Sequence, residues 1–194
     1  MIPRRARSLF RLLGIALLAA GLACAAAGLW IPVKAVMAQH LLDRAFTASL
    51  NTGHVVKPWS WADTWPVARV SVPRLGISVV VLAGDSGQAL AFGPGHVNGT
   101  ARPGEPGTAV FAAHRDTHFD FLDQLNHGDV IEVQRTDGVI AHYTVQRTAV
   151  VRWDRSGIDP DEAGQHLVLA TCWPLHATTP GDQRYLVVAQ ATPR

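Results

Sequence analysis

The sequence has 194 residues, of which 48% are hydrophobic and 16% are charged, with a formal net charge of +2. A chain of this length and apolar content can build one globular domain with an additional segment. Four of its basic residues precede residue 12, and without them 13 basic residues stand against 15 acidic ones. The chain therefore lacks the excess of basic residues that is typical of nucleic-acid-binding domains, and we expect no nucleic acid partner.

Residues 12–30 form an apolar run of nineteen residues without a charge, and Arg4, Arg5, Arg7 and Arg11 precede it. As a helix this run would measure about 28 Å, close to the thickness of the hydrocarbon core of a bilayer. The basic residues predict a cytoplasmic N-terminus and an exported remainder of the chain. A cleaved signal peptide has the same basic, apolar and Ala-rich order and is the alternative. Because the run continues past any Ala-x-Ala site, we predict a retained single-pass anchor.

Residues 35–50 carry apolar side chains at helical spacing, which predicts an amphipathic linker helix. This helix could lie on lipid or pack on the following domain, and the sequence does not decide between them. The next segment contains Trp59, Trp61 and Trp65. Tryptophan is common at membrane interfaces, but we favour packing of this linker against the domain.

From Val67 onward the sequence consists of short segments rich in Val, Ile and Thr, separated by Pro, Gly, Asp and Asn. Seven or eight such segments predict a mainly β fold, either an antiparallel barrel or a sandwich, with short helices near residues 86–92 and 118–125. The chain thus divides into three predicted parts. They are a basic tail and transmembrane anchor (1–33), a helical, Trp-rich linker (34–64) and a β domain (65–194).

Cys172 has no disulfide partner in the β domain, because the second cysteine, Cys24, lies in the apolar run. An inert buried cysteine is the simplest interpretation. A free thiol outside the cytoplasm is, however, open to oxidation. Cys172 ends a strand-like segment, and Arg184 begins the next one twelve residues later. Antiparallel pairing would bring this guanidinium beside the thiol, where positive charge favours the reactive thiolate.

A catalytic thiol also needs a proton donor for its leaving group, usually a histidine. Of nine histidines, His114 ends an apolar segment and begins a polar one, as Cys172 does. His114 and His118 have the spacing of a zinc pair, but no third ligand is evident, so we predict no metal there. Asp116 could orient His114 or cap the following turn.

Two segments and one arginine resemble the sortases, a family of membrane-anchored cysteine transpeptidases. The segments are AAHRDTHFDFLDQL (112–125) and LATCWP (169–174), and Arg184 follows them. The family hallmark is Thr-Leu-x-Thr-Cys at a strand end, and residues 168–172 read Val-Leu-Ala-Thr-Cys. Valine in place of the first threonine removes a hydroxyl, which affects local packing only. The Trp-rich segment and FGPGH further resemble the Gram-negative branch called class GN, and the resemblance extends from about Trp30 to Val188.

The resemblance implies an eight-stranded sortase β-barrel and three catalytic roles. Cys172 would be the nucleophile that holds the acyl group, and His114 would be the general acid and then the base. Arg184 would stabilise the oxyanion or position the substrate.

The same resemblance yields three candidate substrate-binding residues. Thr171 matches a position that helps shape the substrate pocket, and Trp173 belongs to the TCWP motif. The family places the loop of His96 near the substrate groove, although a structural role for His96 is the alternative.

The expected partners follow from the resemblance as well. The substrate would be an exported protein with a C-terminal sorting signal similar to Leu-Pro-x-Thr-Gly, and the acceptor an amine, for example of a cell-wall component. We expect the enzyme in the inner membrane with its barrel in the periplasm, where tethering to the same membrane face would raise the effective concentration of the substrate. No cofactor is expected. Calcium at Asp159, Asp161 and Glu162 is an alternative to an ordinary solvated loop.

Two other functions stay open from the sequence. Other exported thiol peptidases or transpeptidases also pair cysteine with histidine, although the segment around Cys172 lacks the Gly-Cys-x-Arg-like cluster of L,D-transpeptidases. A membrane-tethered barrel that binds a peptide, with Cys172 inert, is the non-enzymatic possibility.

Overall fold

The computed structural model describes residues 14, 17, 18, 21, 24, 36–177, 179 and 181–192. Most of the predicted transmembrane anchor lies outside these residues, so the anchor stays a prediction. Among the residues that the structure describes, no helix is both long and apolar enough to cross a membrane. The chain divides into two units, Met1–Gln39 and His40–Arg194. The second unit contains the whole β domain and is described below.

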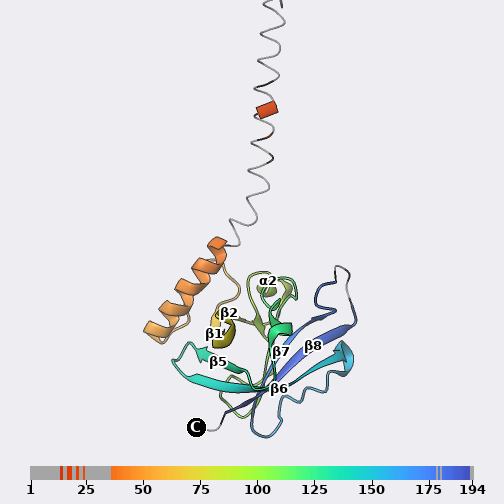
Figure 1. Ribbon diagram of the computed structural model, residues 1–194. Helices are drawn as coiled ribbons and strands as arrows, with labels where there is room; N and C mark the ends of the chain where they lie inside the picture. The colour runs from red at the N-terminus through yellow and green to blue at the C-terminus, as the bar shows by residue number, and fades with distance from the viewer. Residues whose placement is uncertain are drawn as a thin grey trace, which may run out of the picture. The chain divides into compact units, whose positions relative to one another are not determined.

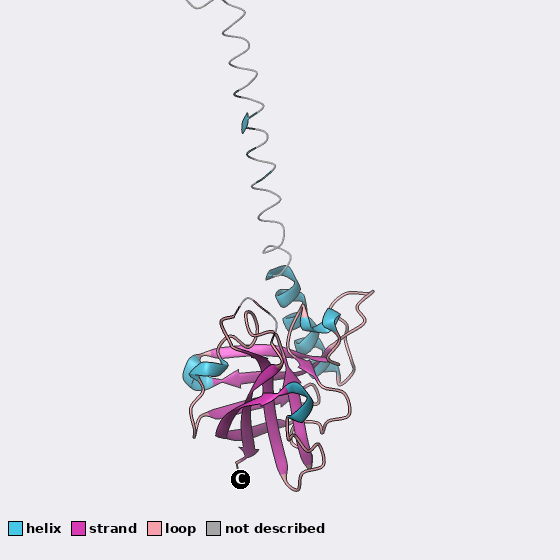
Figure 2. Ribbon diagram, turned by 90° about the vertical axis from the view of Figure 1, so that its right-hand side faces the viewer, coloured by secondary structure: helices cyan, strands magenta, loops and turns pink. Residues whose placement is uncertain are grey.

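Eight strands close into a barrel. Figures 1 and 2 show the barrel from two sides. The order around the barrel is β1-β2-β3-β4-β7-β8-β6-β5, and all neighbouring pairs are antiparallel except β2–β3 and β4–β7. The expected eight-stranded barrel is confirmed, whereas the sequence pattern did not indicate the two parallel pairs. The strands are β1 (Pro66–Val72), β2 (Ile77–Ala83), β3 (Gly95–His96), β4 (Gly107–Ala112), β5 (Val130–Arg135), β6 (Ile140–Arg152), β7 (Gln165–Trp173) and β8 (Gln183–Ala191).

Short helical turns connect several of these strands. They are η1 (Pro73–Leu75), α2 (Gly87–Leu90), η2 (Leu122–Gln124) and η3 (Trp153–Arg155). Both α2 and η2 lie where short helices were predicted. Ser86 caps α2, because its side chain accepts a hydrogen bond from the amide of Ala89 (3.2 Å).

Alternating side chains fill the interior of the barrel. In β1, Ala68, Val70 and Val72 point inward, and the residues between them are partly exposed. Strands β4 and β7 differ, because apolar side chains on both of their faces are covered. On the outer face, Val110, Val168 and Leu186 form a second buried cluster. Burial on both faces is typical of parallel strands, and β4 and β7 pair in parallel.

The helix before the barrel packs on the outside of β2. Leu42 and Phe46 are buried against Val80 and Leu82. Arg69 of β1 adds an ion pair with Asp43 at 2.8 Å and lies 4.8 Å from the ring centre of Phe46. This part of the amphipathic helix therefore packs on the domain, one of the two placements that the sequence allowed.

The linker that follows the helix also contacts the barrel domain. Trp59 packs edge-to-face on Phe92, with ring centres 5.1 Å apart. Trp61, by contrast, is 83% exposed. Packing of the linker on the domain therefore involves the first of these two tryptophans and not the second.

Candidate active site

Cys172 and Arg184 face each other at the loop end of the β7–β8 hairpin. The two are register partners in an antiparallel pair, one position before β7 ends and one position after β8 begins. This is the pairing expected from their spacing in the sequence. The hairpin thus brings a thiol and a guanidinium to the same edge of the barrel.

His114 reaches that edge from the parallel neighbour of β7. Ala112 of β4 pairs with Ala170 of β7, so His114 and Cys172 each lie two residues beyond a matched position. Two hydrogen bonds extend the match past the strand end: the amide of Ala113 donates to the carbonyl of Ala170 (3.2 Å), and Thr171 Oγ1 donates to the carbonyl of Ala113 (2.7 Å). The buried Thr171 side chain therefore ties the backbone beside Cys172 to the backbone beside His114.

His114, Cys172 and Arg184 line one cavity of about 420 Å³. The structure thus brings together the three residues predicted to be catalytic, together with Thr171. The rest of the wall is largely apolar and comes from segments whose local sequence does not indicate a binding role. These wall residues include Leu90, Val97, Trp153, Ile158 and Leu186. No local pattern marks them, because they come from separate segments that meet only in the folded barrel.

The hydrogen bonds of Arg184 leave part of its guanidinium available. Its Nη1 donates to the carbonyls of Gly181 (3.1 Å) and Gln183 (2.8 Å). Within the described part of the chain, its Nε and Nη2 make no hydrogen bond, and no carboxylate lies within ion-pair distance. This arginine can therefore donate to an oxygen atom placed in the cavity.

The side chain of His114 is exposed, and its ring has no hydrogen-bond partner among residues 36–177, 179 and 181–192. The same holds for the carboxylate of Asp116, so no contact supports either role considered for it. Burial lowers the pKa of the nearby His118 below its ordinary value, and the charge of His114 lowers it further, against an opposing effect of Asp120. His118 therefore tends to stay neutral beside His114.

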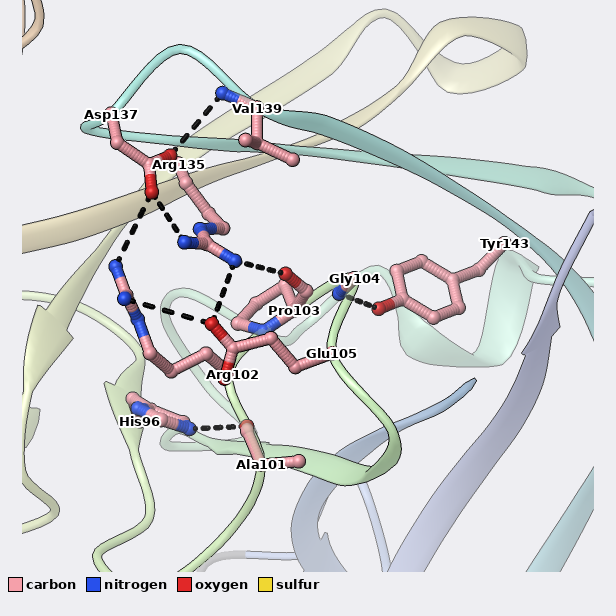
Figure 3. Close-up of polar contacts among 10 residues, drawn as sticks. All are labelled: His96, Ala101, Arg102, Pro103, Gly104, Glu105, Arg135, Asp137, Val139 and Tyr143. Carbon is pink, nitrogen blue, oxygen red and sulfur yellow. Dashed lines mark hydrogen bonds and ion pairs between the residues drawn. The ribbon is translucent and has the colours of Figure 1, made fainter. Parts of the chain in front are cut away.

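Trp173 and His96 are not among the residues that line the cavity of Cys172. Trp173 stacks on Tyr185, with ring centres 5.6 Å apart, and lines a different cavity of about 410 Å³. The ring Nε2 of His96 is 2.9 Å from the carbonyl of Ala101 (Figure 3), and burial lowers the pKa of this histidine. These contacts agree with the structural alternative for His96. Substrate binding by Trp173 and His96 stays a prediction.

The carboxylates of the acidic loop considered for calcium make local contacts. The Asp159 carboxylate accepts a hydrogen bond from the amide of Asp161 (3.0 Å), and Glu162 lies 4.0 Å from His166. Across the residues that the structure describes, no group of three His, Cys, Asp or Glu side chains could hold a metal ion. Calcium binding stays an alternative that no contact supports.

Comparison with known proteins identifies the family. Residues 70–192 match the model of the sortase domain. Sortase D of Bacillus subtilis (strain 168) is 26% identical over 118 residues, which cover 61% of this chain and 60% of the relative. Because the match to the family model extends over more than half of the sequence, the chain belongs to the sortase family.

Solved sortase structures share the fold. Sortase A from Corynebacterium diphtheriae is 27% identical, with a TM-score of 0.62 over 69% of this chain and 64% of that one. Sortase C-1 from Actinomyces oris is 28% identical, with a TM-score of 0.60 over 66% and 74% of the two chains. The chain thus spans less than two thirds of the length of Sortase D and of the diphtherial Sortase A. Membership of class GN stays a prediction.

Proposed function

We propose that this protein is a cysteine transpeptidase that cuts a sorting signal and transfers the acyl part to an amine. One observation carries the proposal: His114, Cys172 and Arg184 come from three different strand ends and line one cavity in a chain of the sortase family. A nucleophile, a proton carrier and an oxyanion donor at one site are the groups that acyl transfer through a thioester needs.

In the first half of the reaction, the Cys172 thiolate attacks the carbonyl carbon of the scissile peptide bond. The negative charge moves to the carbonyl oxygen, which accepts hydrogen bonds from the free nitrogens of Arg184. His114, as imidazolium, gives its proton to the leaving amine while the C–N bond breaks. A thioester on Cys172 and a neutral His114 remain.

In the second half, an incoming amine attacks the thioester carbon. His114 accepts a proton from this amine, the C–S bond breaks, and Cys172 leaves as thiolate with Arg184 again beside the oxygen that carries charge. The enzyme returns to its starting protonation state, and one peptide bond has replaced another.

The apolar part of the cavity wall supports a substrate that begins with apolar residues. Leu90, Val97 and Ile158 can bury the Leu-Pro portion of a signal similar to Leu-Pro-x-Thr-Gly, and the threonine carbonyl would then meet Cys172. We further propose that the substrate is an exported protein anchored beside this enzyme at the inner membrane. The acceptor would be an amine in the periplasm, such as that of a cell-wall component.

Trapping of the acyl-enzyme tests this function. The protein is incubated with peptides that vary around Leu-Pro-x-Thr-Gly, and intact-mass spectrometry measures the mass added to it. We expect an adduct equal to the fragment that ends at threonine, located on Cys172 and lost in Cys172→Ala, whose thermal unfolding should match that of the wild type. A folded protein that forms no adduct with any such peptide contradicts the proposal. Failure of Cys172 to react with an alkylating probe would favour a peptide-binding barrel.

A further inference from the structure

Arg115 connects the segment of His114 to the loop between the two strands that carry Cys172 and Arg184. This loop, the β7–β8 loop, comprises residues 174–182. Arg115 Nη1 donates to the carbonyl of Pro174 (2.8 Å), and Nη2 donates to the carbonyl of Thr179 (2.7 Å). One guanidinium thus holds both limbs of the loop.

These two bonds suit arginine for a geometric reason. The guanidinium is planar and its two terminal nitrogens point in fixed directions, so binding both carbonyls fixes their separation. Hydrogen bonds from a charged donor are also stronger than those from a neutral one. Within the described part of the chain, no carboxylate forms an ion pair with Arg115. The arginine is therefore held by the loop and not by a competing acid.

The second limb of the loop in turn contacts Arg184. Gly181, two residues after Thr179, provides one of the carbonyls that bind Arg184 Nη1. Its backbone lies against the end of β7: a Cβ at this position would be 2.5 Å from the carbonyl oxygen of Trp173. The contacts from Arg115 to the loop and from the loop to Arg184 thus form a continuous series that begins beside His114 and ends opposite Cys172.

We propose that Arg115 is a positioning residue of the active site. It holds the β7–β8 loop in the conformation in which the carbonyl of Gly181 directs the guanidinium of Arg184 to the Cys172 side of the cavity. The role in turnover rests on the proposed transpeptidase function, whereas the effect on the loop does not.

A kinetic comparison tests the role in turnover. Arg115→Met keeps the alkyl chain and removes the guanidinium, and it should lower the rate of thioester formation about 10-fold to 100-fold, with a smaller change in KM. Arg115→Lys should recover part of this loss, because an ammonium can bind one carbonyl but cannot span both as a planar fork. Arg69→Met, which removes a comparable arginine contact on the helix side of the barrel, is the matched control and should keep the wild-type rate.

A double-mutant cycle tests whether Arg115 acts through Arg184. In an Arg184→Met background, Arg115→Met should change the rate of thioester formation less than about twofold, because the group that it positions is gone. An undiminished effect in that background would overturn the proposal, as would a wild-type rate for the single Arg115→Met variant.

Hydrogen exchange tests the loop without any substrate. The amide of Ala177 donates to the carbonyl of Pro174, which Arg115 also binds. Arg115→Met should therefore speed exchange in residues 175–177, 179 and 181–182, and Arg69→Met should leave it unchanged. Unchanged exchange in Arg115→Met overturns the inference even if the enzyme is active. If the wild type forms no thioester but Arg115→Met still speeds exchange in the loop, the proposed function is wrong and the role of Arg115 in holding the loop is retained.

Discussion

Arginines at the two ends of the barrel have different partners. Where β4 and β7 end, Arg115 and Arg184 donate to backbone carbonyls. Near the start of β7, Arg135 is 9% exposed and lies between Glu105 (3.0 Å) and Asp137, and its Nη1 also donates to the carbonyl of Pro103 (Figure 3). The seven residue steps from the first position of β7 to Cys172 put these ends roughly 23 Å apart.

The arginines at the two ends differ in whether carboxylates neutralise their positive charge. A carboxylate beside Arg184 would compete for its nitrogens and would oppose negative charge on the thiol or on a developing oxyanion. Backbone carbonyls orient a guanidinium without cancelling its charge. At the other end, Glu105 and Asp137 neutralise Arg135 and join the segment before β4 to the β5–β6 turn. One end therefore suits chemistry and the other suits stability, and substitutions at the two ends should have separable effects.

His114→Ala should lower turnover more than Arg184→Lys, Arg135→Met or His118→Gln does. Without a proton donor for the leaving amine, the rate of transpeptidation should fall about 10²-fold to 10⁴-fold. The thiol should still react with an alkylating probe, because the strand that carries it is unchanged. Single-turnover assays by mass spectrometry measure the rate of transpeptidation, and alkylation kinetics measure the reactivity of the thiol. Turnover at the wild-type rate would remove His114 from the mechanism.

Arg184→Lys should lower turnover about 100-fold while leaving the unfolding temperature near that of the wild type. Lysine keeps the charge but cannot reproduce the planar fork that binds carbonyls with one side and an oxyanion with the other. Steady-state kinetics with a sorting peptide measure turnover, and thermal denaturation measures the unfolding temperature. Near-normal kcat/KM in this variant would contradict the oxyanion role.

Arg135→Met should show the opposite pattern at the other end of the barrel. The loss leaves the carbonyl of Pro103 without its side-chain donor, and Glu105 and Asp137 keep only Arg102 as an arginine partner. This should lower the free energy of unfolding by about 2 kcal/mol. Urea denaturation measures this change. Activity per folded molecule should match the wild type, and a large fall in kcat would mean that the two ends are coupled.

His118→Gln should have the smallest effect, visible only as a change in pH dependence. Burial lowers the pKa of His118 in the folded protein, so below about pH 6.5 the unfolded chain binds a proton that the folded chain resists. Stability that is fully present above that pH should fall as the pH drops toward the folded pKa. As the pH falls from 7.5 to about 5.5, the variant should lose less stability than the wild type, as measured by thermal unfolding. His96 has a lowered pKa of the same sign and should maintain part of the dependence in both proteins.

The sequence alone was sufficient for the β-rich character of the domain and for the pairing of Cys172 with Arg184. Both depend on local information: strand propensity in short segments, and the register of one hairpin whose two positions are twelve residues apart. A hairpin leaves few ways to place its two ends. The family hallmark added the eight-stranded barrel, which pattern alone left open between barrel and sandwich.

Only the tertiary structure decided which strands are neighbours and which face each side chain takes. His114 and Cys172 line one cavity because β4 and β7 lie parallel and are buried on both faces, and no spacing in the sequence indicates this proximity across 58 residues. Trp173 follows Cys172 directly in sequence, yet it lines a different cavity, because successive side chains of a strand point to opposite sides. Long-range packing and strand alternation, which no single segment contains, thus determined the composition of the candidate site.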